Sequence, residues 1–538
     1  MTANSKERLA SRDGIQSVEN ASNASTELKS RLLGVATATL SASHGYIPEI
    51  EEFGKTLNAR SKRPSSSGLP TFLRQLRKNQ ATLEDMVQDS LHSQLPDDAL
   101  RQLGRKLEIC AVNISHGSLH WSVLKRCRSL VSINQAFQGS DRDMRKREVE
   151  KMCLTGREKE AAHRTIKAQA KVEAHVVQGG AEWLVVHTLQ PDRLARQMTD
   201  SGWGWGEHNV GDAVDEQEWE DVMLAKQVKR LVAAARINRH EYRIPRLRIV
   251  MPNIGKENND INVLLEQLGR IDPGVEIIVE GRDGEFLKTP PPELDVAIRN
   301  LLGYEFDGLT DTLNMDHTIL IDLISDITHF RLEPKPWQEE TTRAQIEEEM
   351  EHDGAMVKAL YPIIENRTLV CTREAAEHFH DVLATVGTSS EKERGNLLVP
   401  FAQFYRDQSE TALRSRFEEL SAHALPSTVQ IPIKVVDECW TWPEIEQAAS
   451  SSRLPAMAID VARHSGFKSS KLSIFMYGWA SGNVTLTSNK EIKGNIKTMV
   501  ETHRRGDDDY GPSIWRLDVT RNLLAKSSSP RGHDGEGM

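Results

Sequence analysis

The hydrophobic pattern in the first third of the chain has the period of α-helices. In the segment LPTFLRQLRKNQATLEDMVQDSL the apolar residues recur mostly every three or four positions, which places them on one face of a helix. The segment RSKRPSSSG, at 60–68, interrupts this pattern and is typical of a loop. Residues 1–28 are rich in Ser, Asn and Ala, and we expect them to be disordered. The pattern therefore predicts a helical region over residues 29–171.

The period changes near residue 172, where short strands begin to alternate with helices. KVEAHVVQGGAEWLVVHTL predicts two strands around a Gly-Gly turn, and a long helix is expected at about 213–236. PRLRIVMPN, DINVLLEQLGRI and GVEIIVEG then predict a strand, a helix and a strand. This alternation favours a central α/β unit over residues 172–287 with a largely parallel sheet.

A second α/β stretch follows KTPPPELD, at 288–295, whose consecutive prolines favour extended backbone and mark a boundary. DTLNMD and RTLVCT predict strands, each followed by a helix. TVQIPIKVVD, KLSIFMY and PSIWRLDV predict further strands, with helices at WPEIEQAASSS and PAMAIDVARHSG. We therefore predict a C-terminal α/β domain over residues 305–522 and a disordered tail over 523–538.

Composition indicates a soluble globular protein, with 38% hydrophobic and 27% charged residues. No stretch approaches the roughly 18 consecutive apolar residues that a membrane span requires. The first residues also lack the apolar segment of a signal peptide. We therefore expect no membrane association, and a cytoplasmic or nuclear location.

The net charge of −10 conceals an uneven distribution. Residues 55–171 contain 23 Lys and Arg against 12 Asp and Glu, a net charge of +11, so the rest of the chain is strongly acidic. A basic region of this kind can bind the phosphates of RNA. Long amphipathic helices also expose Lys and Arg simply to remain soluble. Charge alone leaves both interpretations open.

Two acidic residues follow predicted strands in the C-terminal domain. Asp316 ends the strand in TLNMDHTILIDLISDIT, and Glu374 follows RTLVCT at the start of the next helix. Ligands of open parallel sheets bind outside the carboxyl ends of the strands, so the two carboxylates could converge on one Mg²⁺ or Mn²⁺ ion. Acids at helix N-termini are also favoured as caps, and the spacing does not separate the two roles.

The C-terminal segments LNMDHT, TLVCTREAAEHFHDVLATVGTSSEKERGNLL and SSKLSIFMYGWASGNVTLTSN resemble the uncharacterised eukaryotic domain-of-unknown-function 1308 family. LNMDHTILIDLIS also resembles the first strand and helix of PIN domains. The resemblance implies a PIN-like three-layer α/β/α sandwich on a mainly parallel sheet. PIN domains are typically metal-dependent ribonucleases with three or four acidic ligands.

By motif match, Asp316 and Glu374 are the expected catalytic acids and metal ligands, and Asn489 is a further expected ligand. Where the family has an aspartate after a late strand, this chain has Trp479 in the segment Tyr-Gly-Trp. Two-metal hydrolysis needs enough negative charge to hold both ions. The resemblance therefore implies an RNA-associated ribonuclease that uses Mg²⁺ or Mn²⁺, or a degenerate version of one.

A non-catalytic scaffold is the alternative hypothesis. Such a protein would bind protein partners through its N-terminal helices and through DSGWGWGEHNVGDAVDEQEWED, an acidic segment with three tryptophans that is expected to form an exposed loop and a helix start. The sequence does not distinguish this alternative from the nuclease, and it gives no oligomeric state.

Overall fold

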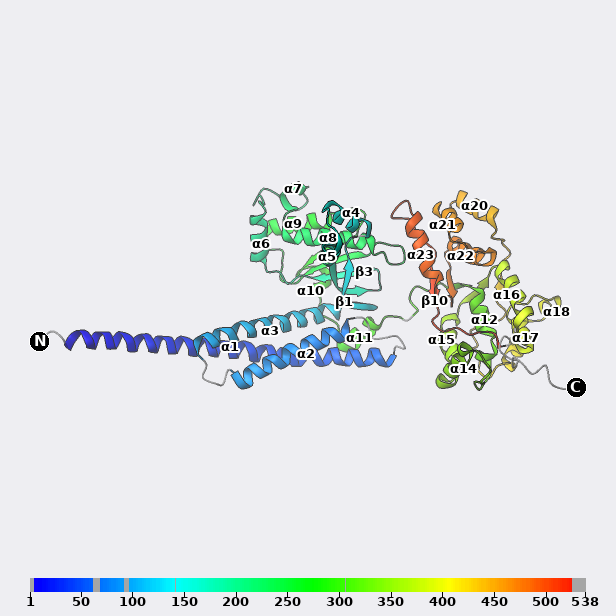
Figure 1. Cartoon of the computed structure of the whole chain (residues 1–538), viewed down its shortest axis with the longest axis horizontal. Coiled ribbons are helices and arrows are strands. Elements are labelled where there is room, and N and C mark those ends of the chain that lie inside the picture. Colours follow the sequence, from blue (N-terminus) through cyan, green and yellow to red (C-terminus); the bar gives the residue numbers. More distant parts are fainter. Residues whose placement is uncertain (1–3, 61–67, 91–95, 141, 305, 525–538) are drawn as a thin grey trace. The chain divides into compact units, whose positions relative to one another are not determined.

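The computed structural model describes residues 4–60, 68–90, 96–140, 142–304 and 306–524, and it divides the chain into two compact units (Figure 1). Unit 1 comprises the described residues of 1–240 and 244–305, and unit 2 comprises those of 241–243 and 306–538. Within these described ranges, no helix is both long and apolar enough to cross a membrane.

Unit 1 combines a bundle of long helices with a five-stranded mixed sheet. Its helices are α1 (Asn4–Arg60), α2 (Leu69–Asp85), the π-helix η1 (Met86–Ser90), α3 (Asp97–Leu124), α4 (Arg142–Lys151), α5 (Gly156–Gln169), α6 (Pro191–Asp200), α7 (Glu216–Trp219), α8 (Met223–Ile237), α9 (Asn259–Gly269), α10 (Glu285–Lys288) and α11 (Leu294–Leu302). Its strands are β1 (Leu130–Gln138), β2 (Lys171–Gln178), β3 (Glu182–Val186), β4 (Arg246–Met251) and β5 (Ile277–Gly281).

The sheet of unit 1 has the order β1-β2-β3-β4-β5 and is covered by helices on both faces (Figure 1). Strand β3 shows why, because Leu184 and Val186 join the core beneath α1–α3, whereas Trp183 and Val185 face the opposite core with α6, α8 and α9. Alternate residues of a strand point to opposite faces, so a strand that is buried on both sides reads as one apolar run. The N-terminal helices and the central sheet therefore share one core.

Three sequence predictions for unit 1 need correction. α1 begins at Asn4, so residues 4–28 are helical in the structure, where we had expected disorder. Strand β1 lies inside the region predicted to be helical, because its long antiparallel pairing with β2 is a contact that local periodicity does not display. The sheet is also mixed, since β1, β2 and β3 pair antiparallel and only β3, β4 and β5 are parallel.

Unit 2 contains a five-stranded sheet, and none of its described helices is as long as α1, α2 or α3. The strands are β6 (Thr312–Met315), β7 (Thr368–Cys371), β8 (Lys434–Val435), β9 (Val484–Thr487) and β10 (Ile514–Arg516). The helices are α12 (His317–Ile324), α13 (Asp326–His329), α14 (Glu340–His352), α15 (Ala355–Ile364), α16 (Arg373–Val386), α17 (Ser389–Leu398), α18 (Gln403–Arg406), α19 (Glu410–Glu419), α20 (Trp442–Ser450), α21 (Met457–His464), α22 (Ser469–Ser481) and α23 (Ile492–His503).

All pairings in the sheet of unit 2 are parallel, in the order β10-β9-β6-β7-β8. The first strand of unit 2, β6, is therefore central, and later strands are added on both sides of it. Helices α12 and α15–α17 cover one face, and α21–α23 pack in a separate core with β10. This arrangement confirms the predicted α/β sandwich on a parallel sheet. The residues of the predicted tail beyond 524 lie outside the described part of the chain.

One predicted strand of unit 2 is wrong. KLSIFMY lies in helix α22, which is buried against the sheet and the neighbouring helices. Gly478 permits this close packing, because a Cβ atom at that position would lie 2.1 Å from Thr485 Oγ1. A short apolar run does not distinguish a buried helix from a buried strand, and here it is a helix. The late strand of the fold is instead β9, which begins seven positions after the end of KLSIFMY.

Candidate functional site

The carboxyl ends of β6 and β9 define the candidate site of unit 2. Strands β7 and β8 are added on one side of β6, whereas β9 and β10 are added on its other side. The connections therefore reverse direction between β6 and β9. In open α/β sheets, ligands bind at such a reversal, outside the carboxyl ends of the strands. Asp316 directly follows β6, and the segment 487–489 closes β9, so both predicted ligands from these strands lie at this edge.

Asp316 is buried and hydrogen-bonded to its own chain. Its side chain caps α12 by accepting a weak hydrogen bond from the Thr318 amide at 3.5 Å. Its Oδ2 accepts stronger hydrogen bonds from the hydroxyls of Thr318, at 3.0 Å, and Thr487, at 2.5 Å. Asp316 is only 1% exposed, so its carboxylate has little contact with solvent. The cap role that the sequence left open is therefore confirmed.

The electrostatic state of Asp316 depends on these neighbours. Burial would raise the pKa of the carboxyl, but the adjacent His317 ring and the hydroxyls of Thr487 and Thr318 outweigh it, so the pKa lies below its ordinary value. The Nδ1 atom of His317 is 2.8 Å from Asp316 Oδ1 without forming an aligned hydrogen bond. Asp316 is therefore a stabilised carboxylate at neutral pH.

The other two predicted ligands have structural partners as well. Glu374 lies in the first turn of α16, where its Oε1 accepts a hydrogen bond from the Trp440 amide at 2.9 Å. Its Oε2 is buried and has no hydrogen-bond partner. Asn489 Oδ1 accepts from the Glu491 amide at 3.1 Å. The backbone amide of Asn489 donates to Thr487 Oγ1, and Thr487 in turn connects Asn489 to Asp316. No hydrogen bond among the described residues joins Glu374 to Asp316 or to Asn489.

Trp479 is not at the end of a strand, which corrects the sequence interpretation of this residue. It lies in α22, where its indole nitrogen donates to the Tyr510 carbonyl at 2.9 Å and its ring packs against two cores. The residues that follow the late strand are instead Ser488 and Asn489. Ser488 and Asn489 therefore place a hydroxyl and an amide at this edge of the sheet.

The three predicted ligands fit a hard divalent ion poorly. Mg²⁺ requires several oxygen ligands in near-octahedral geometry, but each of the three predicted ligands already accepts a hydrogen bond from the chain. Within the described ranges, no three His, Cys, Asp or Glu side chains are arranged to hold a metal ion. Among the side-chain oxygens of the three predicted ligands, Oε2 of Glu374 is the one that is buried without a partner in the described part of the chain.

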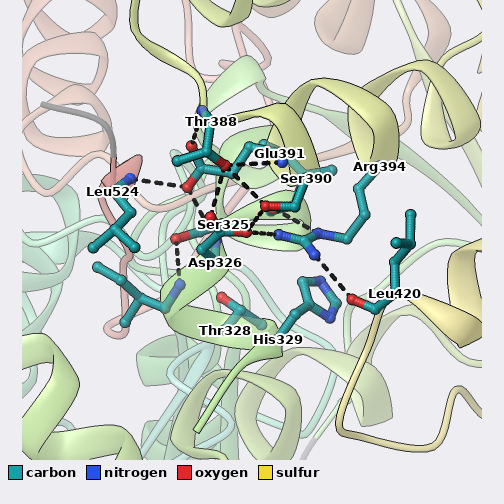
Figure 2. Close-up of polar contacts among 12 residues, drawn as sticks. Ser325, Asp326, Thr328, His329, Thr388, Ser390, Glu391, Arg394, Leu420 and Leu524 are labelled. Atoms are coloured by element: carbon teal, nitrogen blue, oxygen red, sulfur yellow. Dashed lines mark hydrogen bonds and ion pairs between the residues drawn. The ribbon is translucent and has the colours of Figure 1, made fainter. Parts of the chain in front are cut away.

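Sequence reasoning missed a larger polar network that is centred on Asp326, Glu391 and Arg394 (Figure 2). Arg394 is fully buried; its Nη2 pairs with Asp326 Oδ1, and its Nε and Nη1 each donate at 2.9 Å to the carbonyls of Ile324 and Leu420. The hydroxyls of Thr388 and Ser390 also donate to Asp326, at 2.6 and 2.7 Å. A buried ion pair is tolerated only when its remaining polar atoms are satisfied in this way.

Glu391 extends this network to the C-terminal segment of unit 2. Its Oε1 accepts from the amides of Asp326 and Leu524, at 3.0 and 2.9 Å, and its Oε2 accepts from the Thr388 amide at 2.9 Å (Figure 2). Burial raises the pKa of Glu391, and burial likewise lowers the pKa of Arg394. Glu391 and Arg394 therefore have a structural role, because they connect α17 to α13 and to the C-terminal segment.

A second group of buried polar contacts involves Arg521 on the C-terminal segment. Arg521 is 2% exposed and donates through Nε to Glu349 at 2.6 Å. Its backbone amide donates to Asp322 Oδ1, also at 2.6 Å. Burial raises the pKa of Asp322 to about 7, although this hydrogen bond opposes the shift. In the sequence, Asp322 is the acid of LIDLIS, and nothing there distinguishes it from an acid at an ordinary helix position.

Replacing Thr487 with valine tests the hydroxyl that holds Asp316. We expect Thr487→Val to lower the free energy of unfolding of unit 2 by about 1–3 kcal/mol, because it leaves a buried carboxylate with one fewer donor. The matched control is Thr498→Val on α23, where the exposed hydroxyl bonds only to the Gly494 carbonyl, and its effect should stay within about 0.5 kcal/mol. The prediction is contradicted if both variants change the hydrogen exchange of the β6 amides equally.

Comparison with known families gives a match over part of unit 2. The family model described as "Protein of unknown function (DUF1308)" matches residues 313–425. The matched region includes Asp316, Glu374, Glu391 and Arg394, and it ends before β9 and Asn489. Neither the curated proteins nor the solved structures contain a significant match to this chain.

Proposed function

We propose that this chain, which carries a DUF1308 domain at residues 313–425, uses unit 2 as a PIN-like scaffold that does not hydrolyse RNA. The parallel sheet with its first strand in the centre, and an acid directly after that strand, support the PIN-like assignment. The observation that carries the proposal is the Asp316 carboxylate, which is buried and bonded to two hydroxyls of the chain. In this role the acid stabilises the junction of β6, α12 and β9.

A scaffold needs a surface for partners, and two regions of unit 1 were predicted to supply it. The tryptophans of the acidic segment do not favour that segment, because Trp203 and Trp219 are buried in the core and only Trp205 is substantially exposed. The N-terminal helices are better supported. Ile109 and Val112, one turn apart on α3, are 61% and 65% exposed, and exposed aliphatic pairs of this kind suit docking into a partner's groove.

The unpartnered Oε2 of Glu374 favours a second candidate, a metal-dependent ribonuclease. In that case Asp316, Glu374 and Asn489 would hold Mg²⁺ or Mn²⁺, and the basic region of residues 55–171 would bind RNA phosphates. The hydroxyls of Thr318 and Thr487 would first have to release Asp316. This requirement makes the scaffold the better-supported candidate.

Metal titration and an RNA assay separate the two candidates. For a scaffold, millimolar Mg²⁺ or Mn²⁺ should change the melting temperature of the full chain by less than about 1 °C, because only a ligand that binds the native state stabilises it. Labelled single-stranded RNA should remain intact with the wild type and with Asp316→Asn alike. Cleavage that requires Mn²⁺ and disappears in Asp316→Asn would establish the nuclease instead. Glu377→Gln, an exposed acid on α16, is the control for nonspecific charge effects.

A further inference from the structure

Unit 1 contains a cluster of histidines that neither candidate function uses. His116 and His120 lie four residues apart on α3, and His175 lies on β2. The ring centroid of His120 is 5.2 Å from that of His116 and 4.5 Å from that of His175, and His116 and His175 are 6.4 Å apart. Residues four apart share one face of a helix, so α3 directs both of its rings towards the sheet.

These rings line a cavity of about 470 Å³ between α2, α3, β1 and β2. Its wall also contains the side-chain amides of Gln75, Asn79 and Asn113. The volume lies within the range of roughly 300–1,000 Å³ that is typical of small-molecule sites. The lining is unusually polar for such a site, which indicates a ligand that makes several hydrogen bonds.

The hydrogen-bonding state of His175 is fixed by the backbone. The Val186 amide donates to His175 Nδ1 at 2.8 Å, so a neutral His175 must carry its proton on Nε2 and act there as a donor. The Nε2 atoms of His116 and His120 are buried without a partner among the described residues, and His120 as a whole is only 8% exposed. Buried polar atoms without partners are rare in native proteins, and these two require an explanation.

The charges around the cavity are few. Lys78 on α2 and Glu173 on β2 are the charged residues of its wall, and burial raises the pKa of Glu173. Burial, followed by repulsion from the neighbouring imidazoles, lowers the pKa of His120 to about 3 and that of His175 to about 4. His187, after β3, is lowered to about 4 by burial and by His116. An anion in the cavity would stabilise a protonated ring at His116 or His120 and so oppose this lowering of the pKa.

We propose that this cavity binds the phosphate group of a small ligand, with His116, His120 and His175 donating hydrogen bonds from Nε2 to its oxygens. A protonated imidazole donates from both nitrogens, so binding is coupled to proton uptake by His116 or His120, whereas His175 stays neutral because its Nδ1 accepts from the Val186 amide. A hydrogen phosphate also carries a hydroxyl, which suits the unpartnered Oδ1 of Asn134 in the cavity wall. Metal binding is disfavoured, because the Val186 amide occupies the Nδ1 lone pair of His175 and leaves a donor at Nε2.

Calorimetric titration of the full chain tests this proposal with inorganic phosphate, adenosine monophosphate and sulfate. We expect His120→Gln to weaken phosphate binding at least about tenfold, and Glu173→Gln, which removes the opposing charge, to strengthen it several-fold. Sulfate keeps its charge between pH 6.0 and 7.5, so its affinity reports on the protein, and it should be at least about fivefold higher at pH 6.0. Tighter binding of the nucleotide than of phosphate identifies an organic phosphate as the ligand, and the reverse identifies free phosphate.

The proposal is overturned if phosphate binds wild type and folded His120→Gln equally, or if the affinity for sulfate does not change with pH. Circular dichroism establishes whether His120→Gln folds, and if it does not, the Glu173→Gln and sulfate results decide. Tighter binding of Zn²⁺ than of phosphate would also overturn the assigned ligand class. These outcomes are independent of the metal and RNA assays on unit 2, because all residues of the cavity belong to unit 1.

Discussion

Replacing Arg394 with methionine is expected to lower the free energy of unfolding of unit 2 by about 3–5 kcal/mol, because it leaves Asp326 buried without its counter-charge. Arg394 is fully buried and also satisfies the carbonyls of Ile324 and Leu420, which would lose their donors as well. Loss of this size is large relative to the total stability of a typical domain. Hydrogen exchange of the α12 and α17 amides measures it separately from unit 1.

The matched control is Arg416→Met on α19. Arg416 is also paired with two acids, Glu393 and Glu419, but its side chain is 48% exposed. Exposed ion pairs are screened by solvent and contribute little, so this variant should change the unfolding free energy much less than Arg394→Met does. A second test is Asp326→Asn in the Arg394→Met background, which removes the orphaned charge and should recover part of the loss. Similar losses in the two single variants would show that water reaches the Asp326 network.

Acid is expected to destabilise unit 1 through its histidines. The pKa of His120, His175 and His187 is about 3–4 in the folded chain and about 6.5 when unfolded, so the unfolded chain binds more protons between these values. The stabilisation is fully present above pH 6.5 and is lost as the pH falls towards 4. Each histidine then costs about 1.4 kcal/mol per pH unit, or roughly 2 kcal/mol at pH 5.

The variant His120→Phe isolates one of these groups. The difference in unfolding free energy between this variant and the wild type should shift by about 2 kcal/mol in favour of the variant from pH 7.5 to pH 5, because phenylalanine has no proton to bind. Phe72→Leu serves as the control, since this ring lies 5.9 Å from His120 and its packing loss should not depend on pH. Hydrogen exchange of the α3 and β2 amides provides the measurement. An equal pH dependence in His120→Phe and wild type would contradict the prediction.

Much of the architecture of unit 2 could be predicted from local pattern. β6, β7 and the helices that follow them have short apolar runs next to polar caps, and both strands lie where the sequence predicted them. The exception, KLSIFMY in α22, fails for a definite reason, because a helix buried on most sides has no polar face to reveal its period. In unit 1, β1 was missed because its strand character depends on pairing with β2, more than 30 residues later.

The site could be predicted only in part. The position of Asp316 at the end of the central strand follows from the sequence, and so does its capping role as one of two alternatives. Its bond to Thr487 does not, because 171 residues separate the partners and the late strand had been placed too early. That same misplacement assigned Trp479 to a ligand position. The Asp326–Arg394 pair shows the general difficulty, since nothing in a linear sequence indicates which charges become buried together.

The dependence of unit 2 on its last described residues has a consequence for synthesis. Arg521 and Leu524 supply donors to Asp322 and Glu391 in the interior, and β9 and β10 complete the sheet beside the central strand. Domains generally fold as units while the ribosome proceeds from the N-terminus. Unit 2 must therefore wait until the segment 514–524 has emerged, and its central strand stays open on one side until β9, at Val484–Thr487, has been synthesised. In this interval the nascent polypeptide exposes first the unpaired edge of β6 and then that of β9, and chaperones have the greatest opportunity to bind it.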